Sequence, residues 1–167
     1  MNFVQKMCRY KAWANAKTFT ALASLDQDEI YKPRQSCFAS ILSTLAHNYV
    51  IDDIFRAHLD GKQHQYRAKN TEQSTTLAEL RSRVEDMDTW WIDYADQLDN
   101  DSADKVVNFT FVDGSKGAMT RQEMVLHTVN HSTYHRGYID EMLYSISVVP
   151  PTTDYPAFAP VVGLSRD

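Results

Sequence analysis

Three histidines near the C-terminal end of the chain have the spacing of ligands on a metal-binding helix. His127, His131 and His135 follow one another at intervals of four residues. On an α-helix, residues four apart lie on one face, and two neutral imidazoles at that spacing can bind one cation. His127 and His135 would lie about 12 Å apart along the axis, too far to share one ion at Zn–N distances of about 2.1 Å. The spacing therefore predicts that an adjacent pair binds the ion.

A third imidazole is expected from another helix. We favour His131 with His135 as the pair, and His47 from a second strongly helical segment as the third ligand. Three protein ligands leave a coordination position for water or substrate, as in catalytic zinc sites, whereas structural zinc sites are normally closed by four. Zinc, nickel or ferrous iron would accept imidazoles, and the sequence does not choose between them. The alternative for His47 is a hydrogen-bonded core residue.

A general base is not evident next to these histidines. Ser132 follows His131, so the segment lacks the glutamate of the HExxH zinc peptidases. A base would have to come from elsewhere in the chain, and no catalytic residue is assigned. Four carboxylates are candidates, although such residues are more often ordinary surface carboxylates: Asp52, Asp53, Glu123 and Glu141.

The remaining histidines and the cysteines carry weaker signals. His58 and His64 flank the end of the second predicted helix, and we expect both to be solvated. Cys8 and Cys37 are too few for a disulfide framework and have no CxxC partner, so each is expected to be a core residue with a free thiol. No segment has the pattern of a signal peptide or the length of a membrane span, which favours a cytoplasmic protein.

Composition limits the partners. The chain has 167 residues, 43% of them apolar and 23% charged, which suits one globular domain over residues 1–167. The formal net charge is -5 and no basic run stands out, so a nucleic-acid surface and a membrane surface are both disfavoured. Small molecules are the expected partners.

Hydrophobic periodicity predicts four long helices that position the histidines. Their approximate ranges are 2–24, 40–60, 76–99 and 120–145. Thr76 and Thr120 each stand three residues before a glutamate, as in a capping box. Four helices of similar length are packed most economically as a four-helix bundle, an all-α fold.

The connections are predicted with less regular structure. Residues 105–119 alternate around Asp113-Gly114 and predict a small β-hairpin between the third and fourth helices. Residues 25–39 are expected to form a polar connection. Residues 150–167, with several prolines, are expected to form an extended tail over the domain.

Three blocks of the sequence resemble the DinB-like family. They are residues 10–15 (Tyr-Lys-Ala-Trp-Ala-Asn), Leu45-Ala46-His47 followed by Asp52, and residues 127–137 from His127 to Gly137. The blocks occur in the order of the family and at about its spacing, over nearly the whole chain. The resemblance implies an up-down-down-up four-helix bundle in which His47, His131 and His135 hold a divalent cation.

The resemblance also suggests roles for three neighbours. His127 is expected to lie near the site or to pack as an ordinary helix residue, without binding the ion itself. Asp52 is expected to form a structural hydrogen bond or an ion pair with Arg136. Gly137 is expected to let another helix approach closely.

Proteins similar to this chain include transferases that act with bacillithiol, mycothiol or glutathione. The resemblance therefore implies a metal-dependent thiol S-transferase, with a small thiol and an electrophile as substrates. Two alternatives are a hydrolase that uses metal-bound water, and a non-enzymatic, stress-associated metal-binding protein. A homodimer is also implied. Its interface would use the aromatic residues Trp90, Trp91, Tyr94 and 155–158, unless these belong to the core.

Overall fold

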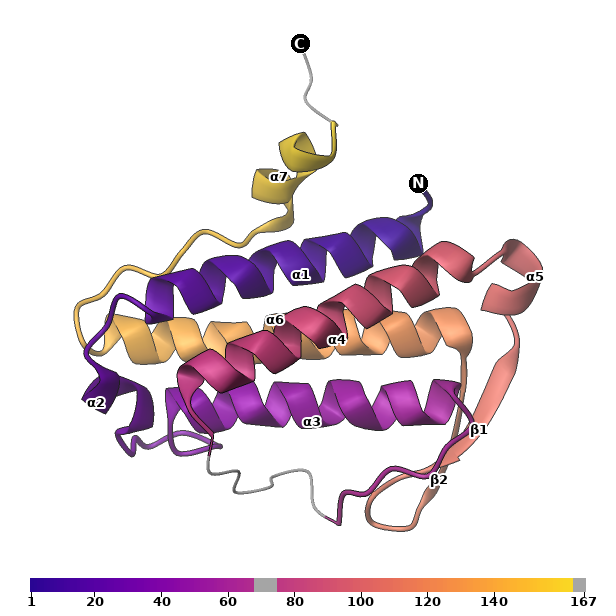
Figure 1. Ribbon diagram of the computed structural model, residues 1–167, viewed down its shortest axis with the longest axis horizontal. Coiled ribbons are helices and arrows are strands. Elements are labelled where there is room, and N and C mark those ends of the chain that lie inside the picture. Colours follow the sequence, from indigo (N-terminus) through magenta and orange to yellow (C-terminus); the bar gives the residue numbers. More distant parts are fainter. Residues whose placement is uncertain (68–74, 164–167) are drawn as a thin grey trace.

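The computed structural model, which describes residues 1–67 and 75–163, is a four-helix bundle with a small β-hairpin (Figure 1). This confirms the predicted fold class, and the long helices begin and end close to their predicted limits. The four bundle helices are α1 (Phe3–Leu22), α3 (Ile41–Leu59), α4 (Leu77–Gln97) and α6 (Arg121–Tyr144).

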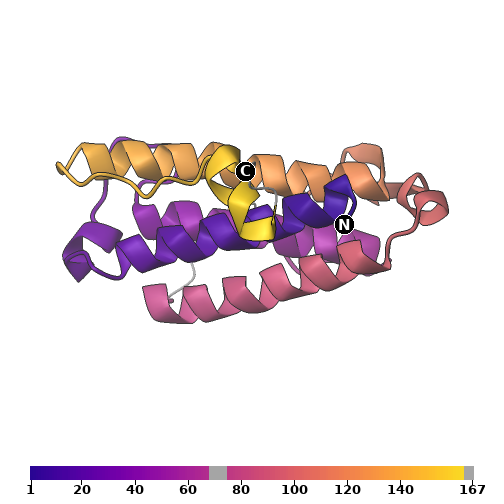
Figure 2. The ribbon, with the colours of Figure 1, turned by 90° about the horizontal axis from the view of Figure 1, so that it is seen from above.

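The four helices run in the up-down-down-up order. In Figure 1, α1 and α6 run in one direction, and α3 and α4 run in the other. α1 packs against α4 and α6, and α3 packs against the same two helices (Figure 2). α3 and α4 are thus parallel to each other, as are consecutive helices in other bundles with a long crossover connection. α3 and α6 are therefore antiparallel neighbours, which places His47 opposite the histidines of α6.

Side-chain caps set the starts of the long helices. Thr76 and Thr120 accept hydrogen bonds from the backbone N–H groups of Glu79 and Glu123, and each glutamate accepts one from the backbone N–H of its threonine. Both predicted capping boxes are thus formed, and they satisfy N–H groups that have no partner inside a helix. The cap at Thr120 sets the residue at which α6 begins, the helix that carries His131 and His135.

The predicted hairpin is present. Strands β1 (Val106–Thr110) and β2 (Lys116–Thr120) pair antiparallel, and Phe109 of β1 is buried against the bundle. Phe109 faces Gly117 across the pair, and a Cβ at Gly117 would lie 2.6 Å from its ring. Glycine is needed there because any side chain would displace Phe109 from the core.

Short helices occupy segments that we expected to be irregular. The predicted polar connection contains α2 (Gln27–Tyr31), and α5 (Asn100–Ala103) follows α4. The predicted extended tail is wrong for its described part after Asp154, because this part forms α7 (Tyr155–Phe158) and a 3-10 turn. Helices of four or five residues are too short to show a helical period in the sequence. The last residues of the predicted tail, 164–167, lie outside the described residues.

The aromatic residues proposed as a dimer surface pack mainly inside the domain. Trp91 is buried, and Trp90 stacks on Tyr94 with ring centroids 5.1 Å apart. Phe158 is also buried and contacts Tyr10 edge-on. Trp91 and Phe158 therefore belong to the core, whereas Trp90, Tyr94 and Tyr155 are partly buried against it. The homodimer stays a prediction.

Two further observations bear on expectations from the sequence. A Cβ built at Gly137 meets no atom within 4 Å, so the expected close approach of another helix there is wrong.

None of the described helices has both the length and the apolar character needed to cross a membrane.

Candidate metal centre

His47, His131 and His135 converge between α3 and α6. One ligand-capable atom of each residue lies within 4.8 Å of the others. Nε2 of His47 and Nε2 of His131 are 3.1 Å apart. A tetrahedral ion with Zn–N bonds of about 2.1 Å separates two ligand nitrogens by roughly 3.4 Å. The observed separation of 3.1 Å is close to this value, so the three histidines can hold a metal ion. Without an ion, the same separation fits a hydrogen bond between the rings of His47 and His131.

The chemistry of the three donors suits a transition metal. His47 and His135 are buried, and burial, followed by the nearby His47, lowers the pKa of His135 to about 4. A neutral imidazole has a free lone pair, which is the form that binds a metal. Nδ1 of His135 is buried and has no hydrogen-bond partner in the described part of the chain. The residues therefore fit a divalent ion with nitrogen ligands, such as zinc, nickel or ferrous iron.

Phe38 covers one side of this histidine group. Its ring stacks on His47 with centroids 4.1 Å apart, and it meets His135 edge-on at 5.1 Å. The backbone N–H of Arg34 donates to the carbonyl of Ala39 across the base of the loop. Ala39 has a positive φ of 62°, a conformation that costs a non-glycine residue energy. Phe38 could not be predicted from the sequence pattern, because only the folded loop brings it to the histidines.

Two tyrosines of α6 contact the other side of His135. The rings of Tyr134 and Tyr138 lie 5.0 Å and 5.8 Å from the His135 ring. Their hydroxyl oxygens are 2.8 Å apart and share a hydrogen bond. This bond with Tyr134 raises the pKa of Tyr138, so the Tyr138 hydroxyl stays protonated at neutral pH. The rings of two tyrosines thus border His135.

His127 lies one turn before the ligand pair, as expected. Its ring is 5.7 Å from that of His131 and 4.4 Å from that of Phe55. It is half-buried and does not belong to the group of three ligand-capable histidines. This position agrees with the prediction that His127 lies near the site without binding the ion.

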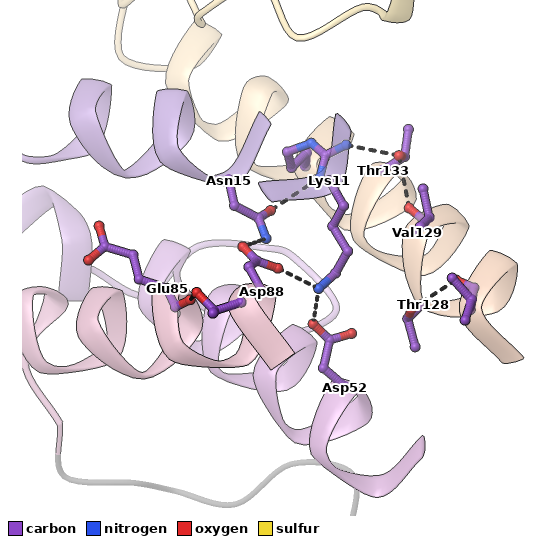
Figure 3. Close-up of polar contacts among 11 residues, drawn as sticks. Lys11, Asn15, Asp52, Glu85, Asp88, Thr128, Val129 and Thr133 are labelled. Carbon is purple, nitrogen blue, oxygen red and sulfur yellow. Dashed lines mark hydrogen bonds and ion pairs between the residues drawn. The ribbon is translucent and has the colours of Figure 1, made fainter. Parts of the chain in front are cut away.

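Asp52 belongs to a buried charge network instead of the metal centre. Nζ of Lys11 lies 2.6 Å from a carboxylate oxygen of Asp52 and 2.7 Å from one of Asp88, so three helices meet at one ammonium group (Figure 3). Asp52 thus makes the expected structural hydrogen bond, with Lys11 as the donor, and the alternative of an ion pair with Arg136 is wrong. Arg136 instead donates hydrogen bonds to Asn15, Tyr10 and Thr133.

The charges of this network perturb one another. Burial raises the pKa of Asp52 to about 6, although Lys11 opposes the effect. Burial alone would lower the pKa of Lys11, but the carboxylates of Asp52 and Asp88 outweigh it and raise the pKa above its usual value. Lys11 therefore stays charged. It belongs to the first of the three sequence blocks, which we had not assigned a role.

The other three candidate bases are also placed elsewhere. Asp53 accepts a hydrogen bond from Tyr66 and pairs with Arg56, and Glu123 caps α6 through Thr120. Glu141 is exposed. None of the four carboxylates is a member of the histidine group.

Two expectations about peripheral residues need correction. His58 and His64 are half-buried instead of solvated, and burial, followed by His64, lowers the pKa of His58. Cys37 is exposed and does not belong to the core, whereas Cys8 is buried as expected. The burial of His58 and His64 and the exposure of Cys37 could not be decided from the sequence, because they depend on how the loops fold around the helix ends.

Comparison with known proteins agrees with this geometry. The model of the DinB family matches residues 1–161. Protein DinB of Bacillus subtilis (strain 168) is 29% identical over 161 residues, which is 92% of this chain and 92% of that protein. Residues 1–161, which the family model matches, span all four bundle helices and the positions of His47, His131 and His135. On this evidence the chain belongs to the DinB family.

Proposed function

We propose that this protein is a metal-dependent enzyme of the thiol S-transferase type, with His47, His131 and His135 as ligands of a divalent ion. The observation that carries the proposal is the convergence of three imidazoles from two antiparallel helices. Three ligands leave a coordination position for an exogenous group, whereas a structural site with four protein ligands has no such position.

A bound divalent ion lowers the pKa of a coordinated thiol, and the thiolate is the reactive nucleophile. In the reaction, a carbon–sulfur bond forms between the thiol and an electrophilic carbon. The bond from that carbon to its leaving group breaks, the leaving group takes the electron pair, and the thiol proton passes to solvent. The chain therefore needs no cysteine of its own for this chemistry.

The residues around the histidines have roles that fit this reaction. Phe38 stacks on His47 and excludes water from one side of the group. Tyr134 and Tyr138 contact His135 and carry hydroxyl groups, which can hydrogen-bond a polar substrate or a departing anion. We therefore assign Phe38 to shielding, and the two tyrosines to substrate orientation.

The positions of the carboxylates favour a thiol over water as the nucleophile. Metal-dependent hydrolysis commonly uses a carboxylate as general base beside the metal. Asp52 and Asp53 are bound to Lys11, Tyr66 and Arg56, and Glu123 caps a helix. A thiol whose pKa is lowered by the ion needs no such base.

The test is turnover by protein purified without a histidine tag and reconstituted with zinc, nickel or ferrous iron. We expect metal-dependent conjugation of monochlorobimane with a thiol from a panel that includes bacillithiol, mycothiol and glutathione. His131→Ala should abolish this activity, and His127→Ala is the matched control on the same helix. No conjugation with any pair would overturn the proposal.

The same preparations separate the two alternatives. Hydrolysis of esters or amides without added thiol would identify a hydrolase. Strong thermal stabilisation by the metal without turnover of any substrate would identify a non-enzymatic metal-binding protein.

A further inference from the structure

A second pair of histidines lies at the far end of α3. His58 is in the last turn of that helix, and His64 follows it after the turn at Gly61. Their rings border a cleft of about 460 Å³ between the end of α3 and strand β1. The cleft is also lined by Lys62, Gln63, Asn108 and Thr110.

The two rings are as far apart as two ligands of one ion. Their centroids are 5.5 Å apart and their planes are inclined by 74°. In the first centre the three centroid distances are 4.4, 4.8 and 5.0 Å. Tetrahedral geometry with Zn–N bonds of about 2.1 Å places the centroids of two coordinated imidazoles roughly 5 Å apart. His58 and His64 therefore need little movement to share an ion.

The pair also has an unsatisfied ring nitrogen and a fixed ring. Nδ1 of His64 is buried and makes no hydrogen bond to any described residue. Buried polar atoms usually have a partner, so this nitrogen calls for a ligand or a water molecule. The His58 ring stacks on Phe109 at 5.0 Å and meets Phe55 edge-on at 5.8 Å. These contacts restrain His58 in the orientation that faces His64.

This pair is separate from the first centre. His58 lies eleven residues beyond His47 on the same helix, or roughly 16 Å along its axis. The rings of Phe55 and His127 lie between the two groups, 4.4 Å from each other. One ion cannot bridge that distance, so the pair would bind an ion of its own.

We propose that His58 and His64 form a second site for a divalent transition ion such as Zn²⁺ or Co²⁺. The ion binds more weakly than at the three-histidine centre, because it receives two imidazoles instead of three. Water and the side-chain oxygen atoms of Gln63 and Asn108, which line the same cleft, are available for the remaining positions. Both ammonium groups at the cleft have partners: Lys62 pairs with Asp60, and Lys116 donates a hydrogen bond to Thr110.

The test is a Co²⁺ titration of the metal-free, full-length protein, followed by absorption spectroscopy and calorimetry. We expect two ions per chain, one bound tightly and one at least about tenfold more weakly. The combined substitution His58→Ala and His64→Ala should remove the weaker ion and keep the tighter one. Lys62→Ala, which changes the same cleft without removing an imidazole, should keep both.

The outcomes separate this inference from the proposed function. His131→Ala should remove the tight ion alone and leave the weaker one in place. A single ion per chain, or a weaker ion that survives the loss of His58 and His64, would overturn the second site. Failure of thiol conjugation with both ions bound would overturn the proposed function and leave the second site standing. Circular dichroism of each variant establishes that it is folded.

Discussion

The Phe38 ring lies nearly parallel to the imidazole of His47, with centroids 4.1 Å apart and planes inclined by 17°. This contact joins the loop before α3 to the histidine group and covers one side of it. We therefore expect the loop to limit how easily an ion or a substrate reaches the histidines from that side.

Replacing Phe38 should open this side of the centre. In Phe38→Ala, we expect the bound metal to pass to a chelator several-fold faster, because the ring no longer shields His47 or restrains its orientation. Stopped-flow transfer of zinc to a coloured chelator measures the rate. Phe3→Ala, which removes an exposed ring from the start of α1, is the control. An unchanged rate in Phe38→Ala would show that metal exchange does not pass Phe38.

The buried network of Lys11 should contribute strongly to folding. The Lys11 side chain is 1% exposed and pairs with Asp52 and Asp88. Lys11→Met removes the cation and leaves two buried carboxylates without it, so we expect a loss of about 3–5 kcal/mol in the free energy of unfolding. Urea denaturation measures this loss.

Lys17→Met is the matched surface control for this experiment. Lys17 is partly exposed and contacts the Trp13 ring, a contact worth on the order of 1 kcal/mol. Adding Asp52→Asn and Asp88→Asn to Lys11→Met should restore much of the lost stability. Equal small losses in the two lysine variants would contradict a structural role for the network.

Asp52 should make stability depend on pH in a particular direction. Its pKa is raised from 3.8 to about 6 in the folded protein, so between these values the folded state binds more protons than the unfolded state. The contribution of Asp52 to the free energy of unfolding is therefore greatest below pH 4 and falls as the pH rises to 6. We expect the free energy of wild type minus that of Asp52→Asn to fall over this range, by on the order of 2 kcal/mol.

This difference is measured by urea denaturation of metal-free protein at several pH values. Subtracting the variant cancels the titration of the histidines, which both proteins share. A difference that is constant with pH, or that rises, would show that Asp52 remains ionised in the folded protein at pH 4.

The two cysteines should differ in reactivity. Burial raises the pKa of the Cys8 thiol to about 12, whereas Cys37 is exposed. Since the thiolate is the form that reacts, an alkylating reagent at pH 8 should modify Cys37 in the folded protein and Cys8 only after denaturation. Mass spectrometry of the labelled peptides identifies the modified residue, and Cys37→Ser is the control. Labelling of Cys8 at a similar rate in the folded protein would contradict its burial.

The sequence predicted the bundle well because its long helices are marked by periodicity and by caps such as Thr76 and Thr120. The spacing of His131 and His135 predicted a shared face, and His47 was correctly placed opposite them. Phe38 and Cys37 could not be predicted, because both lie in a loop whose path depends on tertiary contacts. The partner of Asp52 was also missed, since α1 brings Lys11 to it from 41 residues away in the chain.

The most direct test of the central claim is the zinc affinity of His131→Ala compared with that of His127→Ala. Both residues are histidines of α6, one turn apart, but only His131 lies with His47 and His135. We expect His131→Ala to lower the affinity of the tight site by more than about 100-fold and His127→Ala to keep it within about tenfold. Equal affinities in the two variants would contradict a metal centre built on His47, His131 and His135.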